Sequence, residues 1–167
     1  IKKMDLHPSK IDIGKLAYVF HLTGETDVTD FVSHKLNGAK YGNGIKPKDV
    51  VLYGFGRIGR LLARELMSRT GKGVQMRLRA IVTRGEVTRD VLEKRASMLR
   101  KDSVHGYFKG SVKIDTEQQA LIINGTTVFV ISANAPEDPD YTKYGIKDAL
   151  IIDNTGAFRT EEELSRH

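Results

Sequence analysis

Between residues 49 and 153 the chain alternates short apolar runs with segments of helical spacing. Four of the apolar runs predict strands buried on both faces of a mostly parallel sheet: residues 50–53, 78–82, 127–131 and 149–153. Apolar residues follow helical spacing at residues 58–68 and at residues 86–100. Residues 70–73 are expected to end the first of these helices. The pattern predicts an α/β fold with a Rossmann-type sheet that opens on a βαβ unit.

After residue 110 the apolar residues alternate with polar ones, with a period of two. Three runs predict an antiparallel meander within the sheet, at residues 111–115, 120–123 and 126–131, and the last of them is the strand already predicted at residues 127–131. The hairpin signal Asn124-Gly125 joins the last two of them. Near the end of the chain, Thr160 and Glu163 form a capping box that predicts a new helix shortly before His167. This late helix start and the opening Ile1 lead us to expect a fragment of a longer protein.

Residues 1–46 have a different composition and are expected to form an amino-terminal extension. The apolar positions in residues 11–20 fit either a strand or a short helix, and periodicity alone does not decide between them. Residues 29–36 predict a short helix that Asn37-Gly38 ends in a left-handed conformation. Glycines and a proline at residues 38–47 are typical of a linker. The main domain is therefore expected at residues 47–167.

Composition removes several classes of protein. The 167 residues contain no cysteine, so disulfides, thiolate metal sites and a nucleophilic thiol are excluded within the chain. No apolar run approaches the roughly 20 residues that span a bilayer, and no cleavable leader is visible, so we expect a cytoplasmic protein without a membrane partner. The acids Glu137, Asp138 and Asp140 have no histidine near them in the sequence, which indicates a solvated loop rather than a metal site.

Charge points to anionic partners. The net charge is +6, and nine Lys and Arg residues stand against four acids between residues 76 and 109. Such an excess favours binding of nucleic acid, a phosphorylated metabolite or a dinucleotide. A solvated helix face accounts for most of these charges, and one or two of the arginines are candidates for a specific role. Only Tyr107 and Phe108 are aromatic within this stretch, so stacking platforms for nucleic acid are scarce.

A glycine-rich motif carries the chemistry. G-x-G-x-x-G stands between the first predicted strand and the first predicted helix, at Gly54, Phe55, Gly56, Arg57, Ile58 and Gly59. In this context the first glycine permits a tight turn, the second lets the backbone approach a pyrophosphate, and the third lets the helix pack against the sheet. The N–H groups near Arg57 and Ile58 would hold the anion at the helix N-terminus. The alternative is a glycine turn with a structural role alone.

The end of the second strand bears on which dinucleotide binds. An acid there would hold the adenosine ribose and repel a 2′-phosphate, but this strand ends in Thr83-Arg84, and Glu86 is expected to start the next helix. A hydroxyl and a guanidinium suit a 2′-phosphate, although Arg84 could equally be an exposed loop charge. We therefore predict that NADP is accepted and that NAD is not strictly required, while the preference between the two stays open.

Four segments in the same order resemble the glyceraldehyde-3-phosphate dehydrogenase family. They are the opening fingerprint at residues 54–60, the Asp-Ser-Val-His-Gly segment at residues 102–106, the hairpin at residues 123–125 and the Asn-Thr-Gly-Ala-Phe segment at residues 154–158. The likeness covers residues 50–167, which would then be a truncated NAD(P)-binding domain. Residues 1–46 look like the extension of a longer bacterial type. Tyr53, Asn154 and Thr83-Arg84 depart from the family's usual residues.

The resemblance implies specific residue roles. Phe55, Gly56, Arg57 and Ile58 would line the pyrophosphate; Thr155, Gly156 and Phe158 would flank the adenine and lead toward the nicotinamide. Asn134 would neighbour the adenine. The family's catalytic cysteine and histidine belong to a later stretch, and His105 is expected to have a structural or subunit-contact role. We thus expect this chain to bind NAD or NADP and to catalyse nothing by itself.

For the full-length protein, the resemblance implies a homotetramer that oxidises glyceraldehyde 3-phosphate, with phosphate, to 1,3-bisphosphoglycerate. The sequence does not decide between glycolysis and gluconeogenesis. The competing interpretation is a non-enzymatic module, either a dinucleotide sensor or a basic nucleic-acid binder that uses residues 77–109. Nucleic-acid affinity would fall steeply with salt, whereas saturable NADP binding at moderate salt would favour the enzyme domain.

Overall fold

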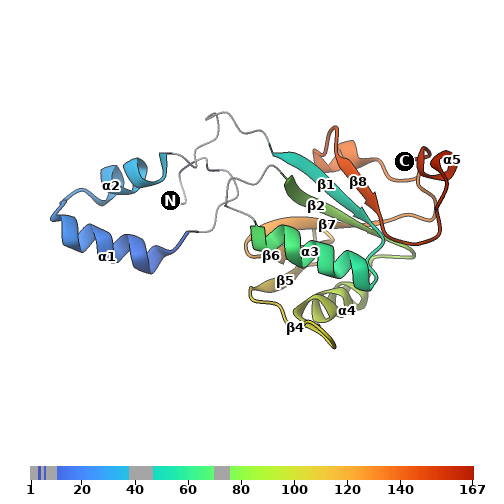
Figure 1. The fold of residues 1–167 in the computed structure, drawn as a ribbon, viewed down its shortest axis with the longest axis horizontal. Helices are drawn as coiled ribbons and strands as arrows, with labels where there is room; N and C mark the ends of the chain where they lie inside the picture. Colours follow the sequence, from blue (N-terminus) through green and yellow to red (C-terminus); the bar gives the residue numbers. More distant parts are fainter. Residues whose placement is uncertain (1–3, 5, 7–10, 38–46, 70–75) are drawn as a thin grey trace. The chain divides into compact units, whose positions relative to one another are not determined.

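The computed structural model describes residues 4, 6, 11–37, 47–69 and 76–167 (Figure 1). Contacts between residues divide the chain into two units, of which the first contains residues 11–37 and the second contains residues 47–69 and 76–167. Apart from Pro47, the linker expected at residues 38–47 lies outside the described residues. The helix end expected at residues 70–73 also lies outside them.

The first unit is a pair of helices, α1 (Ile13–Thr23) and α2 (Val28–Lys35). The open choice for residues 11–20 is thereby decided in favour of a helix, which begins after the N-cap Asp12 and ends at Gly24 in the left-handed region. The rings of Phe20 and Phe31 pack edge to face with centroids 5.3 Å apart.

The second predicted helix of this unit is shifted by one residue. The side chain of Asp27 accepts hydrogen bonds from the N–H groups of Thr29 and Asp30, so α2 begins at Val28 rather than Thr29. The C-cap of α2 is Leu36, with a φ of −101°, so the predicted left-handed stop at Asn37-Gly38 falls on the two residues that follow the cap. Gly38, the other half of the predicted stop, lies outside the described residues.

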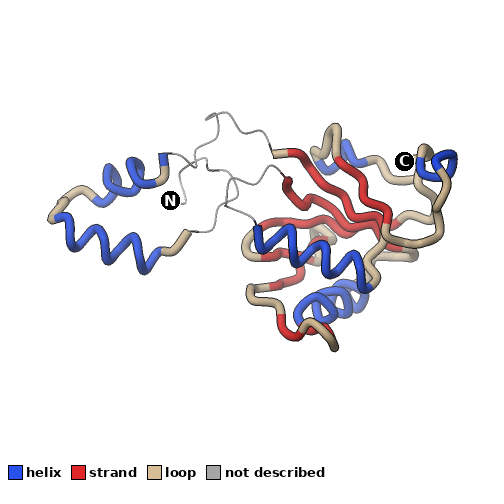
Figure 2. Tube along the Cα trace, in the orientation of Figure 1, coloured by secondary structure: helices blue, strands red, loops and turns tan. Residues whose placement is uncertain are grey.

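The second unit is built on a six-stranded sheet in the order β5-β6-β7-β2-β1-β8 (Figure 2). The strands are β1 (Lys48–Tyr53), β2 (Met76–Thr83), β5 (Val112–Asp115), β6 (Ala120–Ile123), β7 (Thr126–Ser132) and β8 (Leu150–Asp153). The pairs β7–β2, β2–β1 and β1–β8 are parallel, and β5–β6 and β6–β7 are antiparallel. The predicted Rossmann-type sheet with an antiparallel meander is confirmed.

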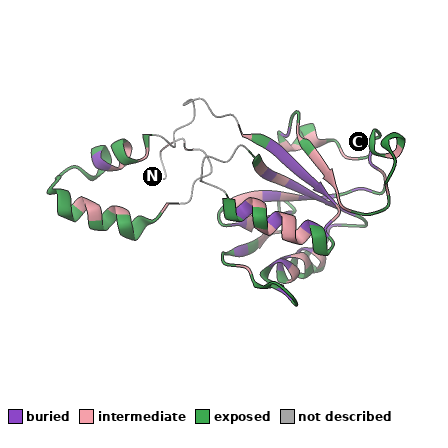
Figure 3. Cartoon of the chain, in the orientation of Figure 1, coloured by how far each residue is buried: buried purple, intermediate pink, exposed green. Residues whose placement is uncertain are grey.

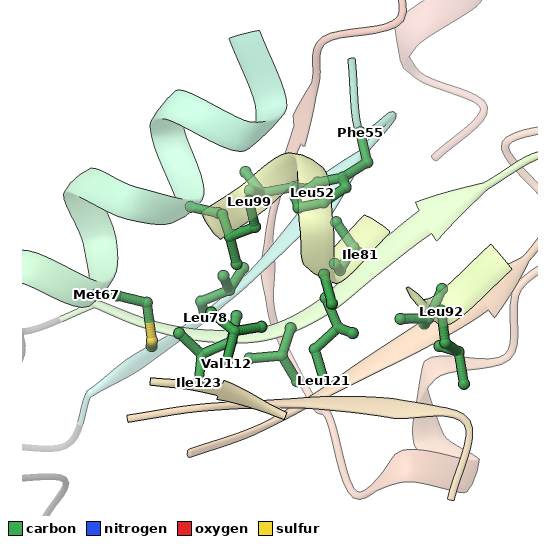
Figure 4. Close-up of a cluster of buried hydrophobic side chains, with 14 of the residues drawn as sticks. Leu52, Phe55, Met67, Leu78, Ile81, Leu92, Leu99, Val112, Leu121 and Ile123 are labelled. Carbon is green, nitrogen blue, oxygen red and sulfur yellow. The ribbon is translucent and has the colours of Figure 1, made fainter. Parts of the chain in front are cut away.

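Alternating side chains of β1 divide the core between the two faces of the sheet, and the strands β1 and β2 are almost wholly buried (Figure 3). Val50 and Leu52 join the cluster shown in Figure 4, whereas Val51 and Tyr53 join the cluster on the other face. A register shift between Val50 and Val51 along the β1–β2 pairing marks a bulge.

The larger cluster lies between the sheet and two helices, α3 (Arg57–Arg69) and α4 (Arg89–Arg100) (Figure 4). Helix α3 packs on β1 and β2, and α4 packs on β5 and β6. A short 3₁₀ helix, η2 (Tyr141–Tyr144), supplies tyrosines to the opposite face. Most hydrophobic positions of both predicted helices thus face the sheet, as their spacing indicates, whereas Ile58 at the start of α3 is exposed.

Two details of the second unit differ from the expectation. Helix α4 begins at Arg89 rather than residue 86, because the Thr88 side chain accepts a hydrogen bond from the Val91 N–H and so acts as the N-cap. The short strands β3 (Lys101–Asp102) and β4 (Gly106–Tyr107) form a small hairpin after α4 that the sequence pattern did not predict. The capping box at Thr160 is confirmed and opens α5 (Glu161–Leu164).

Candidate functional site

The glycine-rich loop lies where the strand order of the sheet reverses. From β1 the chain goes to β2 and β7 on one side, and returns to β8 on the other. All four of these strands are parallel, so their carboxyl ends meet at the same edge. In open α/β sheets, ligands bind outside this edge, at the strand where the order reverses. The loop after β1, residues 54–59, occupies that position.

The first and third glycines are required by close packing. Gly54 has a φ of 98°, and a Cβ there would lie 2.9 Å from Cγ2 of Thr155. At Gly59, a Cβ would lie 2.5 Å from the carbonyl oxygen of Gly54 and would also clash with Oδ1 of Asn154. These two glycines therefore let the loop after β1 and the start of α3 pack directly against the residues that follow β8.

Asn154 joins the two strands at this point. Its Nδ2 donates hydrogen bonds of 3.0 Å to the carbonyl oxygens of Tyr53 and Ile152, and its backbone N–H donates to the same Tyr53 oxygen at 2.9 Å. The ends of β1 and β8 are thereby held together, and the glycine-rich loop begins from a fixed position.

The second glycine lies in open space. No atom lies within 4 Å of a Cβ placed on Gly56, and Gly56, Arg57 and Ile58 are all exposed. In the described part of the chain, no side chain or carbonyl accepts a hydrogen bond from the N–H groups of Arg57 and Ile58. Free N–H groups and the positive end of the helix dipole make this helix start suited to a phosphate.

Phe55 contributes differently from the expectation. Its side chain is buried in the large core cluster, so only its backbone lies near the open end of α3. The N–H of Gly54 donates to the Val82 carbonyl at 2.9 Å, which fastens the loop to β2 as well. The loop is therefore anchored on both sides of its exposed glycine, and its amides are held in place before any ligand arrives.

Thr83, Arg84 and Asn134 lie at the same edge, at the ends of β2 and β7. The Ala133 N–H donates to the carbonyl oxygen of Thr83 at 3.1 Å, which brings Asn134 beside the β2 end. The Thr83 side chain is buried, and its Oγ1 has no hydrogen-bond partner within the described residues. Arg84 and Asn134 are exposed.

On the β8 side, Thr155, Gly156 and Phe158 form a turn. Asp153 Oδ1 accepts hydrogen bonds of 2.8 Å from both the N–H and the hydroxyl of Thr155. Gly156 has a φ of 71°, so the turn requires glycine there. The Phe158 ring packs edge to face on Tyr53, with centroids 6.3 Å apart. Phe158 thus lies beside the start of the glycine-rich loop.

Sequence reasoning missed a buried pair beneath this turn. His167 Nε2 lies 3.1 Å from Asp153 Oδ2, and the His167 ring packs on Tyr53 at 4.6 Å between centroids. Burial is the main cause that raises the pKa of Tyr53 above its usual value, followed by the negative charge of Asp138 and Asp153. The pair is 14 residues apart in sequence, and no local motif announces it.

The acidic loop is also more ordered than expected. Glu137 accepts two hydrogen bonds from Arg166, at 2.8 and 3.0 Å. Asp138 accepts from the N–H groups of Asn134 and Ala135 at 2.9 and 2.8 Å. Asp140 is the N-cap of η2. The three acids are exposed, in agreement with the predicted solvated loop, and each carboxylate in addition fixes a neighbouring segment.

The sequence of this chain matches a known protein family. Residues 48–161 match the model of the family described as "Glyceraldehyde 3-phosphate dehydrogenase, NAD binding domain". The chain belongs to this family. Its cofactor is accordingly a nicotinamide adenine dinucleotide.

The relatives of this chain differ in how much of it they match. A glyceraldehyde-3-phosphate dehydrogenase-like protein of Pseudomonas aeruginosa is 47% identical over 171 residues and matches 100% of this chain. Glyceraldehyde-3-phosphate dehydrogenases of Zymomonas mobilis and Bacteroides fragilis are 34% and 36% identical, and each matches 71% of it. The chain spans only about a third of the length of these relatives, namely 37%, 32% and 32%.

The described residues contain neither a membrane-spanning helix nor a cluster of metal ligands. None of their helices combines the length and the apolar composition that crossing a membrane requires. Nor do three or more of their His, Asp and Glu side chains gather where a metal ion could be held.

Proposed function

We propose that residues 47–167 bind NAD or NADP with the pyrophosphate on the N-terminus of α3. The open space at Gly56 beside the unpartnered N–H groups of Arg57 and Ile58 carries this proposal. A side chain at residue 56 would fill the space that the phosphates need, and the anchored loop presents the amides without rearrangement. When bound, the nicotinamide ring supplies the hydride acceptor for an oxidation.

The remaining residues of the edge have supporting roles in this proposal. Gly54 and Gly59 bring the loop and α3 against the turn after β8, so that Thr155, Gly156 and Phe158 flank the same edge of the sheet. The adenosine side is assigned to the ends of β2 and β7, where Asn134 is exposed and its backbone N–H is held by Asp138. The buried, unpartnered hydroxyl of Thr83 lies at the β2 end.

We further propose that this domain accepts NADP at least as well as NAD. No carboxylate follows β2 at the position that would repel a 2′-phosphate, and Arg84 is exposed there with a full positive charge available. Calorimetric titration of the chain with NAD and with NADP tests this. The Kd for NADP should be equal to or below that for NAD, and Arg84→Ala should weaken NADP at least 10-fold while changing NAD less than 3-fold. A much tighter NAD complex would refute the proposal.

For the full-length protein we propose a phosphorylating oxidation of glyceraldehyde 3-phosphate by a cytoplasmic homotetramer. The names of the relatives support the reaction, and the chain itself contains no cysteine that could attack an aldehyde. The catalytic cysteine is therefore assigned to a part of the protein other than these residues. The chain alone should show no aldehyde-dependent NADH or NADPH formation, whereas the full-length protein should.

The proposed domain organisation is an extension at residues 1–46 followed by the dinucleotide-binding domain. The family match begins at residue 48, whereas the Pseudomonas aeruginosa relative matches the whole chain, so the extension is shared with at least one longer homologue. Deletion of residues 1–46 should leave the Kd for NAD unchanged within about 2-fold. A larger loss of affinity would place part of the cofactor site in the extension.

A further inference from the structure

An arginine cluster lies between α3 and α4, on the side of α3 that faces the β3–β4 hairpin. Arg57, Arg60 and Arg64 follow one another at three- and four-residue spacing along α3, so they share one side of the helix. Arg64 donates to the carbonyl oxygens of Leu99 and Gly106, at 2.9 and 3.0 Å, which fixes α3 against α4 and the hairpin.

Arg95 of α4 adds a further positive charge to this cluster. Its pKa is lowered, first by burial and then by the positive charge of Arg60. The residues one helical turn away from Arg95 on either side are all apolar, namely Val91, Leu92, Met98 and Leu99. No carboxylate of α4 can therefore reach its guanidinium through ordinary helical spacing.

Asp102 is the one carboxylate recorded in contact with the cluster among the described residues. Its Oδ2 lies 3.6 Å from Arg60, whereas its Oδ1 accepts the N–H groups of Val104 and His105 and the His105 ring. These hydrogen bonds hold the pKa of Asp102 far below its usual range, and the hydrogen bond from the His105 N–H has the largest effect. Four arginines are thus balanced by a single ionised acid.

The guanidiniums of Arg60 and Arg95 are recessed. The Arg60 side chain is 12% exposed, and the Nε atoms of Arg60 and Arg95 are both buried without a hydrogen-bond acceptor among the described residues. A half-buried cation beside a second one loses hydration and meets repulsion, and an anion between them relieves both costs.

We propose that Arg60 and Arg95 form a binding site for a phosphate group, either free inorganic phosphate or the phosphate of a small metabolite. Two guanidiniums match the charge of a phosphate dianion, and their N–H groups can bind its oxygens in pairs. A small anion reaches recessed donors more readily than an acidic protein surface does. The site is separate from the amides of Arg57 and Ile58 and does not depend on how the dinucleotide binds.

Thermal unfolding of the chain in chloride and in phosphate at matched ionic strength tests the proposal. The probes are inorganic phosphate and methyl phosphate, each titrated with and without saturating NAD, which blocks phosphate binding at the start of α3. Arg95→Met keeps the length of the side chain and removes its charge. Lys94→Met is the matched control, because Lys94 is exposed on the same helix and the change in net charge is identical.

We expect phosphate to raise the Tm of the unaltered chain saturably, by several degrees at millimolar concentration, in the presence of NAD. Arg95→Met should lose at least three quarters of this shift, and Lys94→Met should retain it. A response to methyl phosphate as well identifies a phosphomonoester site, and a response to inorganic phosphate alone identifies a site for the free ion. An equal shift in Arg95→Met, or no shift in the unaltered chain, would overturn the proposal.

Discussion

Replacing Gly56 and Gly59 of the glycine-rich motif by alanine, one at a time, should separate ligand binding from folding. At Gly59 the added methyl would lie 2.5 Å from the Gly54 carbonyl and would overlap Asn154 Oδ1. Asn154 is held by its Nδ2 on the Tyr53 and Ile152 carbonyls, and Gly54 is held by its N–H on the Val82 carbonyl, so the helix must move away. Overpacking of this kind costs about 2–3 kcal/mol. Gly59→Ala should therefore lower the free energy of unfolding by that amount.

Gly56→Ala should instead weaken NAD binding and leave the stability of the fold intact. Its Cβ would meet no atom within 4 Å, and its φ is not in the left-handed region. Stability should stay unchanged or rise by up to about 1 kcal/mol, because alanine restricts the unfolded chain. The methyl would nevertheless occupy the space assigned to the pyrophosphate, so affinity for NAD should fall at least 10-fold, which is about 1.4 kcal/mol.

Urea unfolding followed by circular dichroism measures the first effect, and calorimetric titration with NAD measures the second. Gly14→Ala is the control for the glycine-to-alanine change, since a Cβ at Gly14 in α1 would make only an ordinary contact of 3.5 Å with Asp12. It should leave the affinity for NAD unchanged. Unimpaired NAD binding by Gly56→Ala, or an undiminished free energy of unfolding in Gly59→Ala, would refute the reasoning.

Three other changes test the packing around the site. Asn154→Ala removes the side-chain donor to the Tyr53 and Ile152 carbonyls and should lower the free energy of unfolding in urea by about 1–3 kcal/mol. Tyr141→Phe should leave it unchanged or raise it by up to about 1 kcal/mol, because burial raises the pKa of Tyr141 to about 12 and its hydroxyl has no partner within the described residues. Asp102→Asn should lower the Tm at pH 7. Because hydrogen bonds lower the pKa of the carboxylate in the folded chain, this loss of Tm should shrink as the pH falls below about 4. A loss of Tm that is the same at every pH would contradict the assignment.

The βαβ unit was predictable because its signals are local. A continuous apolar run, three glycines at fixed spacing and a helical stripe all stand within 34 residues of sequence. By contrast, α1 was left open between strand and helix because the unbroken apolar run at residues 16–20 would surround a helix, so neither period dominates. The predicted start of α4 at Glu86 was wrong, because the hydroxyl of Thr88 caps the helix and α4 begins at Arg89.

Contacts between distant segments account for what the sequence did not reveal of the site. Arg166 and Glu137 are 29 residues apart, and Asn154 and Tyr53 are 101 apart, so both pairings depend on the finished sheet. Burial of the Phe55 side chain is likewise a property of the packed core. The glycines could be assigned from sequence because each meets a backbone requirement, whereas the partners that make Gly54 and Gly59 necessary became visible only in three dimensions.

Amide chemical shifts of the ¹⁵N-labelled chain, recorded during titration with NAD, test most directly whether the start of α3 holds the pyrophosphate. The N–H resonances of Gly56, Arg57 and Ile58 should show the largest changes and should saturate together with the calorimetric binding curve. If these three resonances stay in place while NAD binds, or if the chain ignores both NAD and NADP at millimolar concentration, the central assignment is wrong.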